Sequence, residues 1–179
     1  MNSKLHKMVL TALFTALVCV ATIIIQIPSP MQGYVNLGDG IILLAAWLLG
    51  PIYGAFAGGV GSMLADLLTG YSIYAPGTLI IKGLLALIAA LLFRSLRKIS
   101  HHASAQKKSC LVVPLLLSGI AGEAVMVLGY FGYACLIMGE GLAAATSIPG
   151  NLFQALIGIV AGMLLYPLLV KSGITKKED

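Results

Sequence analysis

Long apolar runs, separated by short breaks rich in glycine, proline and polar residues, constrain the fold of this chain more than any other feature. About 20 apolar residues in a helix span the hydrocarbon core of a bilayer, and most of the runs approach or exceed that length. The second run is short for a span, so we expect it to be tilted or partly buried by its neighbours. We therefore predict an all-α bundle of six transmembrane helices. The helices are expected at about 7–27, 39–49, 51–68, 76–96, 111–138 and 148–170.

Composition agrees with a membrane protein. Hydrophobic residues make up 59% of the chain and charged residues 9%, whereas soluble domains carry roughly 25% charged residues. We expect one transmembrane domain over residues 1–179. The first 27 residues also resemble a secretory signal peptide, but no small-residue cleavage site precedes the polar loop, so we favour an uncleaved first helix.

The basic residues predict the orientation of the bundle. Six crossings put both termini on one side, and lysine and arginine mark the cytoplasmic side of a membrane. With the termini in the cytoplasm, the loops expected outside, 28–38, 69–75 and 139–147, contain no lysine or arginine. Lys82 alone, of 11 basic residues, falls within the membrane. The other ten fall at the cytoplasmic side: Lys4, Lys7, Arg94, Arg97, Lys98, Lys107, Lys108, Lys171, Lys176 and Lys177. This placement explains the net charge of +5 without nucleic-acid binding.

Small residues spaced four apart predict close helix packing. Two stripes of glycine, alanine and serine follow residues 54–65, and Gly158 and Gly162 form a similar pair. Small residues let membrane helices approach closely, so we expect these stripes to pack within the bundle. Ala12 and Ala16 stand apart, because large aliphatic residues surround them. Spacing alone leaves open whether this pair packs internally or docks a partner helix.

Polar residues within the predicted spans gather in their outer halves, whereas the inner halves are almost purely aliphatic. Lys82 lies about 9 Å below the outer end of its helix, at 1.5 Å per residue. A charged group at that depth needs a partner or a polar cavity. Asp66 is one candidate partner, and a ligand is the other. Asp39, at the start of the second helix, is expected to be structural. The pattern predicts a polar cup open to the outside.

Six side chains are the candidates for ligand contact. Glu123 lies in mid-membrane with no basic residue near it in the predicted topology, which favours a ligand partner. Asn151 and Gln154 lie three apart on one helical face. The full set is Asn36, Lys82, Glu123, Tyr130, Asn151 and Gln154.

Catalytic and metal-binding patterns are not visible in the sequence. The three histidines fall in cytoplasmic segments without metal-spaced partners, and "GTLIIKG" lacks the second glycine and the Ser/Thr of a phosphate-binding loop. We expect no enzyme activity, no cofactor, no metal and no ATP hydrolysis by the chain alone.

Two stretches carry a resemblance to a known family. "YVNLGDGIILLAAWLLGPIYGAFAGGVGSMLADLL" and "YAPGTLIIKGLLALIAALLF" resemble the S component of energy-coupling factor (ECF) vitamin transporters, in the branch for hydroxymethylpyrimidine, pyridoxine and related precursors. The resemblance extends from the first helix to the sixth, with the fifth and sixth less diagnostic. It implies a cell-membrane protein that captures a vitamin from outside, the first external loop closing over it.

The resemblance also implies partners. A membrane coupling subunit and a pair of cytoplasmic ATPases would supply the energy, and Ala12 and Ala16 would dock the coupling subunit. A pyridine or pyrimidine with hydroxymethyl groups is the first expectation for the ligand. Pantothenate, an anion that would pair with Lys82, is the second. Riboflavin is disfavoured by the 7% aromatic content. A stand-alone channel or secondary carrier remains the alternative of a different class.

Overall fold

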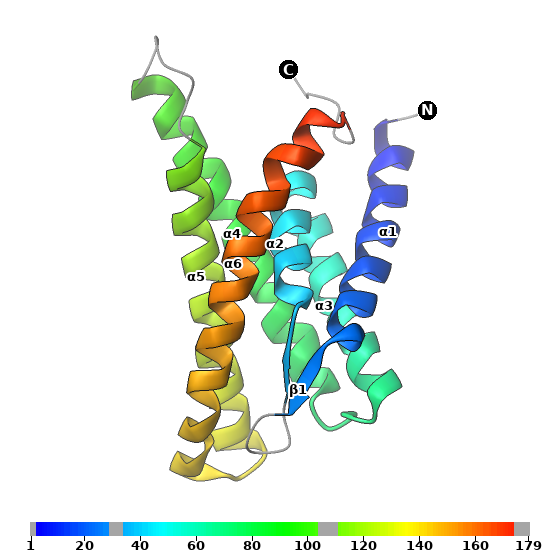
Figure 1. Cartoon of the computed structure of the whole chain (residues 1–179), viewed down its shortest axis with the longest axis vertical. Coiled ribbons are helices and arrows are strands. Elements are labelled where there is room, and N and C mark those ends of the chain that lie inside the picture. Colours follow the sequence, from blue (N-terminus) through cyan, green and yellow to red (C-terminus); the bar gives the residue numbers. More distant parts are fainter. Residues whose placement is uncertain (1–2, 29–33, 104–110, 174–179) are drawn as a thin grey trace.

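The computed structural model describes residues 3–28, 34–103 and 111–173, and these form six α-helices and one small hairpin (Figure 1). Lys107, Lys108, Lys176 and Lys177, which the sequence assigns to the cytoplasmic side, lie outside the described residues. The helices are α1 (Ser3–Ile24), α2 (Gly38–Leu49), α3 (Pro51–Thr69), α4 (Ala75–Ala103), α5 (Val112–Gly132) and α6 (Ile148–Lys171). The all-α membrane bundle predicted from the sequence is confirmed.

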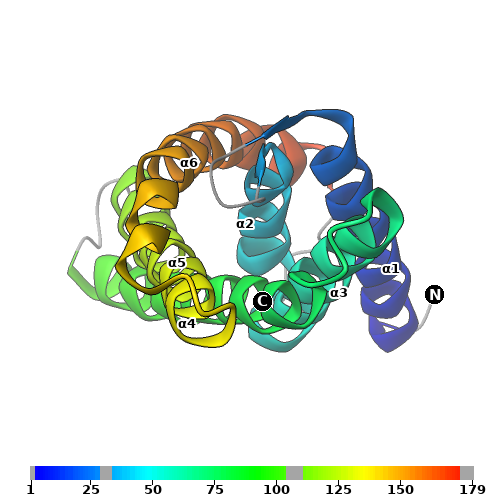
Figure 2. The ribbon, with the colours of Figure 1, turned by 90° about the horizontal axis from the view of Figure 1, so that it is seen from below.

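Helix α2 is the centre of the bundle. It contacts α1, α3, α4 and α6, and in Figure 2 it lies inside the ring of the other helices. Ten of its 12 residues are buried, which agrees with an apolar sequence on all faces of the helix. The neighbouring helices cover α2, so a helix too short to span the bilayer alone is still shielded from lipid.

Close packing of α3 uses the small-residue stripes predicted from the sequence. A Cβ atom added at Gly61 would lie 2.6 Å from the backbone oxygen of Thr15 in α1, and one at Gly58 would lie 2.7 Å from the Ile42 side chain in α2. Both distances are too short for a real Cβ contact, so glycine permits the backbones of α3 and α1 to approach at Gly61 and leaves room for the Ile42 side chain at Gly58. On α6, Gly158 packs in the same way against Asp39.

The structure differs from the sequence prediction mainly at the connections. The first loop contains an antiparallel hairpin of β1 (Gln26–Pro28) and β2 (Tyr34–Asn36), in which Ile27 pairs with Val35. Helix α5 continues as a π-helical turn, Tyr133–Ile137, and a 3₁₀ helix, Gly141–Ser147, leads into α6. Helix α4 runs to Ala103, beyond its apolar stretch.

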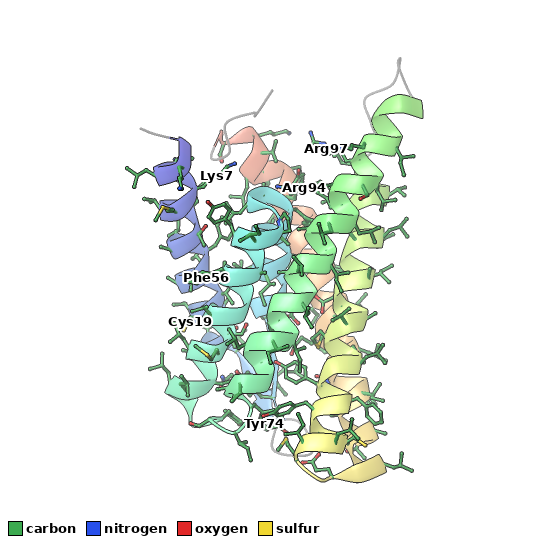
Figure 3. All side chains as sticks on the ribbon, turned by 180° about the vertical axis from the view of Figure 1, so that it is seen from behind. Lys7, Cys19, Phe56, Tyr74, Arg94 and Arg97 are labelled. Carbon is green, nitrogen blue, oxygen red and sulfur yellow. The ribbon has the colours of Figure 1, made fainter. Side chains whose placement is uncertain are left out.

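The two ends of the bundle differ in character. Both termini lie at one end in Figure 1, and the hairpin lies at the other. In Figure 3, Lys7, Arg94 and Arg97 lie toward the terminal end, and Tyr74 lies at the opposite end. We call these parts the terminal half and the hairpin half. The prediction that the hairpin half faces outside rests on the distribution of lysine and arginine.

Five helices of the described residues are long and apolar enough to cross a membrane, and α2 is a shorter apolar helix. Large apolar side chains point outward along the spans, including Leu68, Ile80, Leu128 and Leu164. Such a surface suits contact with lipid chains, since a water-facing surface of this kind would aggregate.

Candidate functional site

A cavity of about 50 Å³ opens among the helix ends of the hairpin half. Every helix except α2 contributes to its wall, together with β2 and the turns before α4 and α6. The lining residues are Thr22, Tyr34, Asn36, Ser62, Asp66, Tyr74, Thr78, Lys82, Tyr130, Ala134, Ser147, Asn151 and Gln154. Most of these side chains are polar, so this half of the bundle contains the polar cup that the sequence predicts.

One wall of the cavity is a closed hydrogen-bond network. Lys82 pairs with Oδ1 of Asp39, and Gln154 Nε2 donates to Oδ2 of the same carboxylate. The backbone N–H of Asn36 donates to Gln154 Oε1 over 2.8 Å, and Asn36 Oδ1 accepts from the Gly38 N–H over 2.8 Å. All of these side chains are buried. Each has a partner within the protein, which is what stabilises charged groups away from water.

The ion pair corrects one sequence prediction. Lys82 pairs with Asp39 rather than with Asp66, the candidate partner from the sequence. The reason is the central position of α2: its first turn brings Asp39 between α4 and α6, where both Lys82 and Gln154 reach it. Lys82 also lies over the ring of Tyr130, with Nζ 5.4 Å from the ring centroid, a favourable cation–π distance.

The second wall, formed by α1 and α3, has polar atoms without partners. Asp66 is buried, and its Oδ1 accepts a hydrogen bond from the Tyr34 hydroxyl, but its Oδ2 has no partner among the described residues. The Oγ of Ser62 and the Oγ1 of Thr22 are also buried and without a partner in the described chain. Buried polar atoms in native proteins are nearly always paired, so three exceptions around one cavity need an explanation.

Tyr34 holds the Asp66 carboxylate from the hairpin. Burial, followed by the charge of Asp66, raises the pKa of the Tyr34 phenol well above its usual range. The phenol therefore stays protonated and donates its hydrogen to Asp66. The Tyr34 ring also contacts the Tyr71 ring, with centroids 4.7 Å apart. The hairpin is thus fastened over the second wall.

The structure brings five of the six sequence candidates to the cavity: Asn36, Lys82, Tyr130, Asn151 and Gln154. Glu123 is buried and does not line the cavity in the described structure. It lies close to the Asp39 and Lys82 side chains, and neither of its oxygens has a hydrogen-bond partner among the described residues. A ligand contact by any of the six stays a prediction.

Sequence reasoning did not single out Thr22 and Ser62. Ser62 precedes Asp66 by four residues on the same helix, and residues at that spacing share a face. That spacing was the available signal for Ser62. Thr22 has no comparable signal, because a threonine near a membrane helix end usually bonds to its own backbone, as Thr11 and Thr15 do here.

The remaining predictions concern α1 and metals. Ala12 and Ala16 are exposed on the outer face of α1, available to a partner helix. Within the described residues, no group of three His, Cys, Asp or Glu side chains is arranged to hold a metal ion.

Comparison with known proteins identifies relatives across nearly the whole chain. Residues 2–171 match the family described as ECF-type riboflavin transporter, S component. The thiamine precursor transporter HmpT of Lactococcus lactis subsp. cremoris (strain MG1363) is 31% identical over 175 residues, which are 97% of this chain and 93% of that protein. An uncharacterized Pyrococcus woesei protein, from a gap 3' region, is 39% identical over 146 residues, or 81% of this chain and 88% of that protein.

A solved structure has the same fold. The S component of a bacterial ECF transporter superimposes with a TM-score of 0.68, covering 95% of this chain and 98% of that one, at 19% sequence identity. At this identity the match bears on the fold alone.

Proposed function

Because the chain belongs to the family of ECF-type transporter S components, we propose that it captures a small hydroxymethylated pyrimidine or pyridine from outside the cell. S components are the substrate-binding membrane subunits of transporters and are not enzymes. The observation that carries the proposal is a small, polar, largely buried cavity in the hairpin half of a membrane bundle.

The size of the cavity favours a single-ring ligand. A buried water occupies roughly 10–15 Å³ of such space, so the 50 Å³ of the cavity correspond to roughly four waters. A flavin has three fused rings and a ribityl chain, which need much more room. The relative from Lactococcus lactis, whose name describes a thiamine precursor transporter, supports the same choice, because such precursors include single substituted rings.

The charge of the cavity disfavours pantothenate. Lys82 is neutralised by Asp39, so the cation that an anionic ligand needs is already paired. The lining atoms without a partner include instead a carboxyl oxygen of Asp66, and an ionised carboxyl group there repels another carboxylate. A neutral or cationic heterocycle meets no such repulsion.

The terminal half disfavours a stand-alone channel or carrier. Below the cavity, the buried rings of Trp47, Phe93 and Tyr166 contact one another, with centroids 5.7–6.2 Å apart. A continuous polar path needs hydrophilic side chains at this level, and these three aromatic rings occupy the bundle interior there. The exposed Ala12 and Ala16 support docking to a membrane coupling subunit, which would work with ATPase subunits in the cell membrane.

Equilibrium titration of the purified protein tests the proposal. The panel is a hydroxymethylated aminopyrimidine, pyridoxine, thiamine, riboflavin and pantothenate, each measured by calorimetry in detergent. We expect the aminopyrimidine or pyridoxine to bind most tightly and with one site per chain. Tighter binding of riboflavin or pantothenate than of both single-ring compounds would overturn the proposed substrate class.

A further inference from the structure

The two walls of the cavity differ in how many hydrogen bonds they leave for a ligand. In the first wall, Asp39, Lys82 and Gln154 already bond to one another. In the second wall, Thr22 Oγ1, Ser62 Oγ and Asp66 Oδ2 are buried without a partner among the described residues. A ligand that enters the cavity therefore finds buried polar atoms without a partner on the second wall.

The neighbours of Asp66 fix the orientation of its carboxyl group and leave one of its two oxygens without a hydrogen bond. Tyr34 donates to Oδ1 and fixes the orientation of the carboxylate. The Thr78 hydroxyl also lies near the carboxyl group, and it shares a 3.0 Å hydrogen bond with the Tyr130 hydroxyl in which either oxygen can be the donor. Oδ2 stays without a partner in the described chain, although Asp66 is only 2% exposed. Leaving such an oxygen buried and unpaired is destabilising, so its retention points to a ligand.

Ser62 and Thr22 flank this oxygen with groups of a different kind. A hydroxyl can both donate and accept, whereas an ionised carboxylate only accepts. Ser62 lies one helical turn before Asp66, and Thr22 reaches the cavity from the end of α1. The wall thus presents a carboxyl oxygen beside two hydroxyl groups.

We propose that Asp66, supported by Ser62 and Thr22, determines the specificity of the cavity by accepting an N–H group of the ligand. The ligand class is a neutral or cationic heterocycle with an amino group next to a ring nitrogen. Its amino N–H donates to Asp66 Oδ2, and its ring nitrogen accepts from a wall hydroxyl. This inference rests on the proposed function and adds the part of the ligand that is recognised, which the sequence candidates on the first wall do not specify.

Two probes separate this role from a structural one. The first is a hydroxymethylated aminopyrimidine. The second is its oxo counterpart, in which a carbonyl oxygen replaces the amino group and the neighbouring ring nitrogen carries a hydrogen, so the donor and acceptor positions of the pair are exchanged. Each is titrated against purified wild-type protein, Asp66→Asn, Ser62→Ala and the control Leu68→Ala. Leu68 follows Asp66 by two residues on α3 but is 72% exposed on the outer surface.

The wild type and Leu68→Ala are expected to prefer the amino probe. Asp66→Asn is expected to weaken binding of the amino probe by on the order of 10- to 100-fold, the range for a hydrogen bond to a charged group. The same variant is expected to bind the oxo probe as well as the wild type does, or better, because the asparagine amide can donate to the carbonyl. Ser62→Ala is expected to weaken binding of the amino probe by about 10-fold or less.

The outcomes distinguish this inference from the proposed function. If the wild type binds neither single-ring probe nor pyridoxine, the proposed function fails. If the wild type binds the amino probe and Asp66→Asn binds it equally well, the role of Asp66 is wrong and the proposed function stands. An equal loss for both probes also overturns the role of Asp66, since a structural defect would weaken both alike. Thermal unfolding of each variant in detergent identifies such a defect.

Discussion

The hairpin half and the terminal half of this bundle use buried polar groups in opposite ways. In the hairpin half, Lys82 and Gln154 both pair with Asp39, yet polar atoms without partners in the described structure remain on Thr22, Ser62, Asp66 and Glu123. In the terminal half, the Trp47 indole donates to Ser118 over 3.0 Å, and aromatic rings fill the surrounding space. The first arrangement suits a half that binds a ligand, and the second suits a half that blocks its passage.

The sequence predicts almost purely aliphatic inner ends, and the structure corrects this. Trp47, Phe93 and Tyr166 come from α2, α4 and α6, and their rings meet in the interior of the terminal half. Edge-to-face and tilted aromatic contacts of this kind add about 0.5–1.5 kcal/mol each beyond the area they bury. The terminal half is therefore rigidly packed by aromatic side chains as well as aliphatic ones.

The largest expected effect is a loss of uptake without a loss of ligand binding. Replacing Ala12 or Ala16 with tryptophan changes the exposed face of α1 and leaves the cavity intact. We expect ligand affinity to stay within about threefold of wild type, while ATP-driven uptake with the coupling partners falls to background. Uptake is measured in liposomes that contain the whole transporter. Normal uptake by both variants would show that this face does not dock the partner.

A second prediction concerns the ion pair of the hairpin half. Lys82→Met leaves the Asp39 carboxylate buried without its cation, and we expect a loss of about 3–5 kcal/mol in the free energy of unfolding. Adding Asp39→Asn to that variant removes the unpaired charge, so the double variant is expected to recover a large part of the loss. Denaturant unfolding in detergent micelles measures both. Asp39→Asn is also measured alone. A loss in the double variant equal to the summed losses of Lys82→Met and Asp39→Asn would contradict the pairing.

A third prediction concerns the aromatic cluster of the terminal half. Trp47→Phe removes the hydrogen bond to Ser118 and part of the ring volume, so we expect a loss of about 1–2 kcal/mol in unfolding free energy. Ligand affinity is expected to be unchanged, because the cavity is in the other half. Ser118→Ala is the matched variant that keeps the indole ring and removes its hydrogen bond, together with the one from Ser118 to the Leu115 carbonyl. A clear loss of affinity in Trp47→Phe would mean that the two halves are coupled.

The smallest expected effect concerns Glu123. The sequence predicts a ligand contact for it, but the carboxyl group lies close to the Asp39–Lys82 pair and does not line the cavity. We expect Glu123→Gln to change ligand affinity by less than about threefold. Asn151→Ala, at a residue that lines the cavity, is expected to weaken binding by about 10-fold. An effect of Glu123→Gln as large as that of Asn151→Ala would bring Glu123 into contact with the ligand.

The sequence predicts the helices well because the bilayer limits the alternatives so strongly. A spanning segment must be apolar, long and helical, and five of the six helices follow from those limits, whereas the short α2 follows from its apolar run alone. The hairpin was not predicted, since strands of three residues such as Gln26–Pro28 carry almost no periodic signal. The π-helical turn at Tyr133–Ile137 and the 3₁₀ helix at Gly141–Ser147 were also not predicted, because each is too short to give a periodic signal.

Pairing within the site was harder to predict than its position. Depth in the membrane places Asp39 and Asp66 at similar levels, so either could meet Lys82. Only the rotation and central position of α2 decide for Asp39, and these depend on packing by all the surrounding helices. Thr22 was missed because a hydroxyl in a membrane helix usually bonds to the helix backbone, and the sequence does not show which hydroxyls do not. For Ser62, the four-residue spacing to Asp66 was a signal that was not used.

The mass of the small molecule that remains bound to the protein when it is purified from cells tests the central claim most directly. Native mass spectrometry in detergent reports both that mass and the stoichiometry. The account predicts one molecule per chain, lighter than a flavin, with a single nitrogen-containing ring. A bound flavin or a bound carboxylic acid such as pantothenate would contradict it.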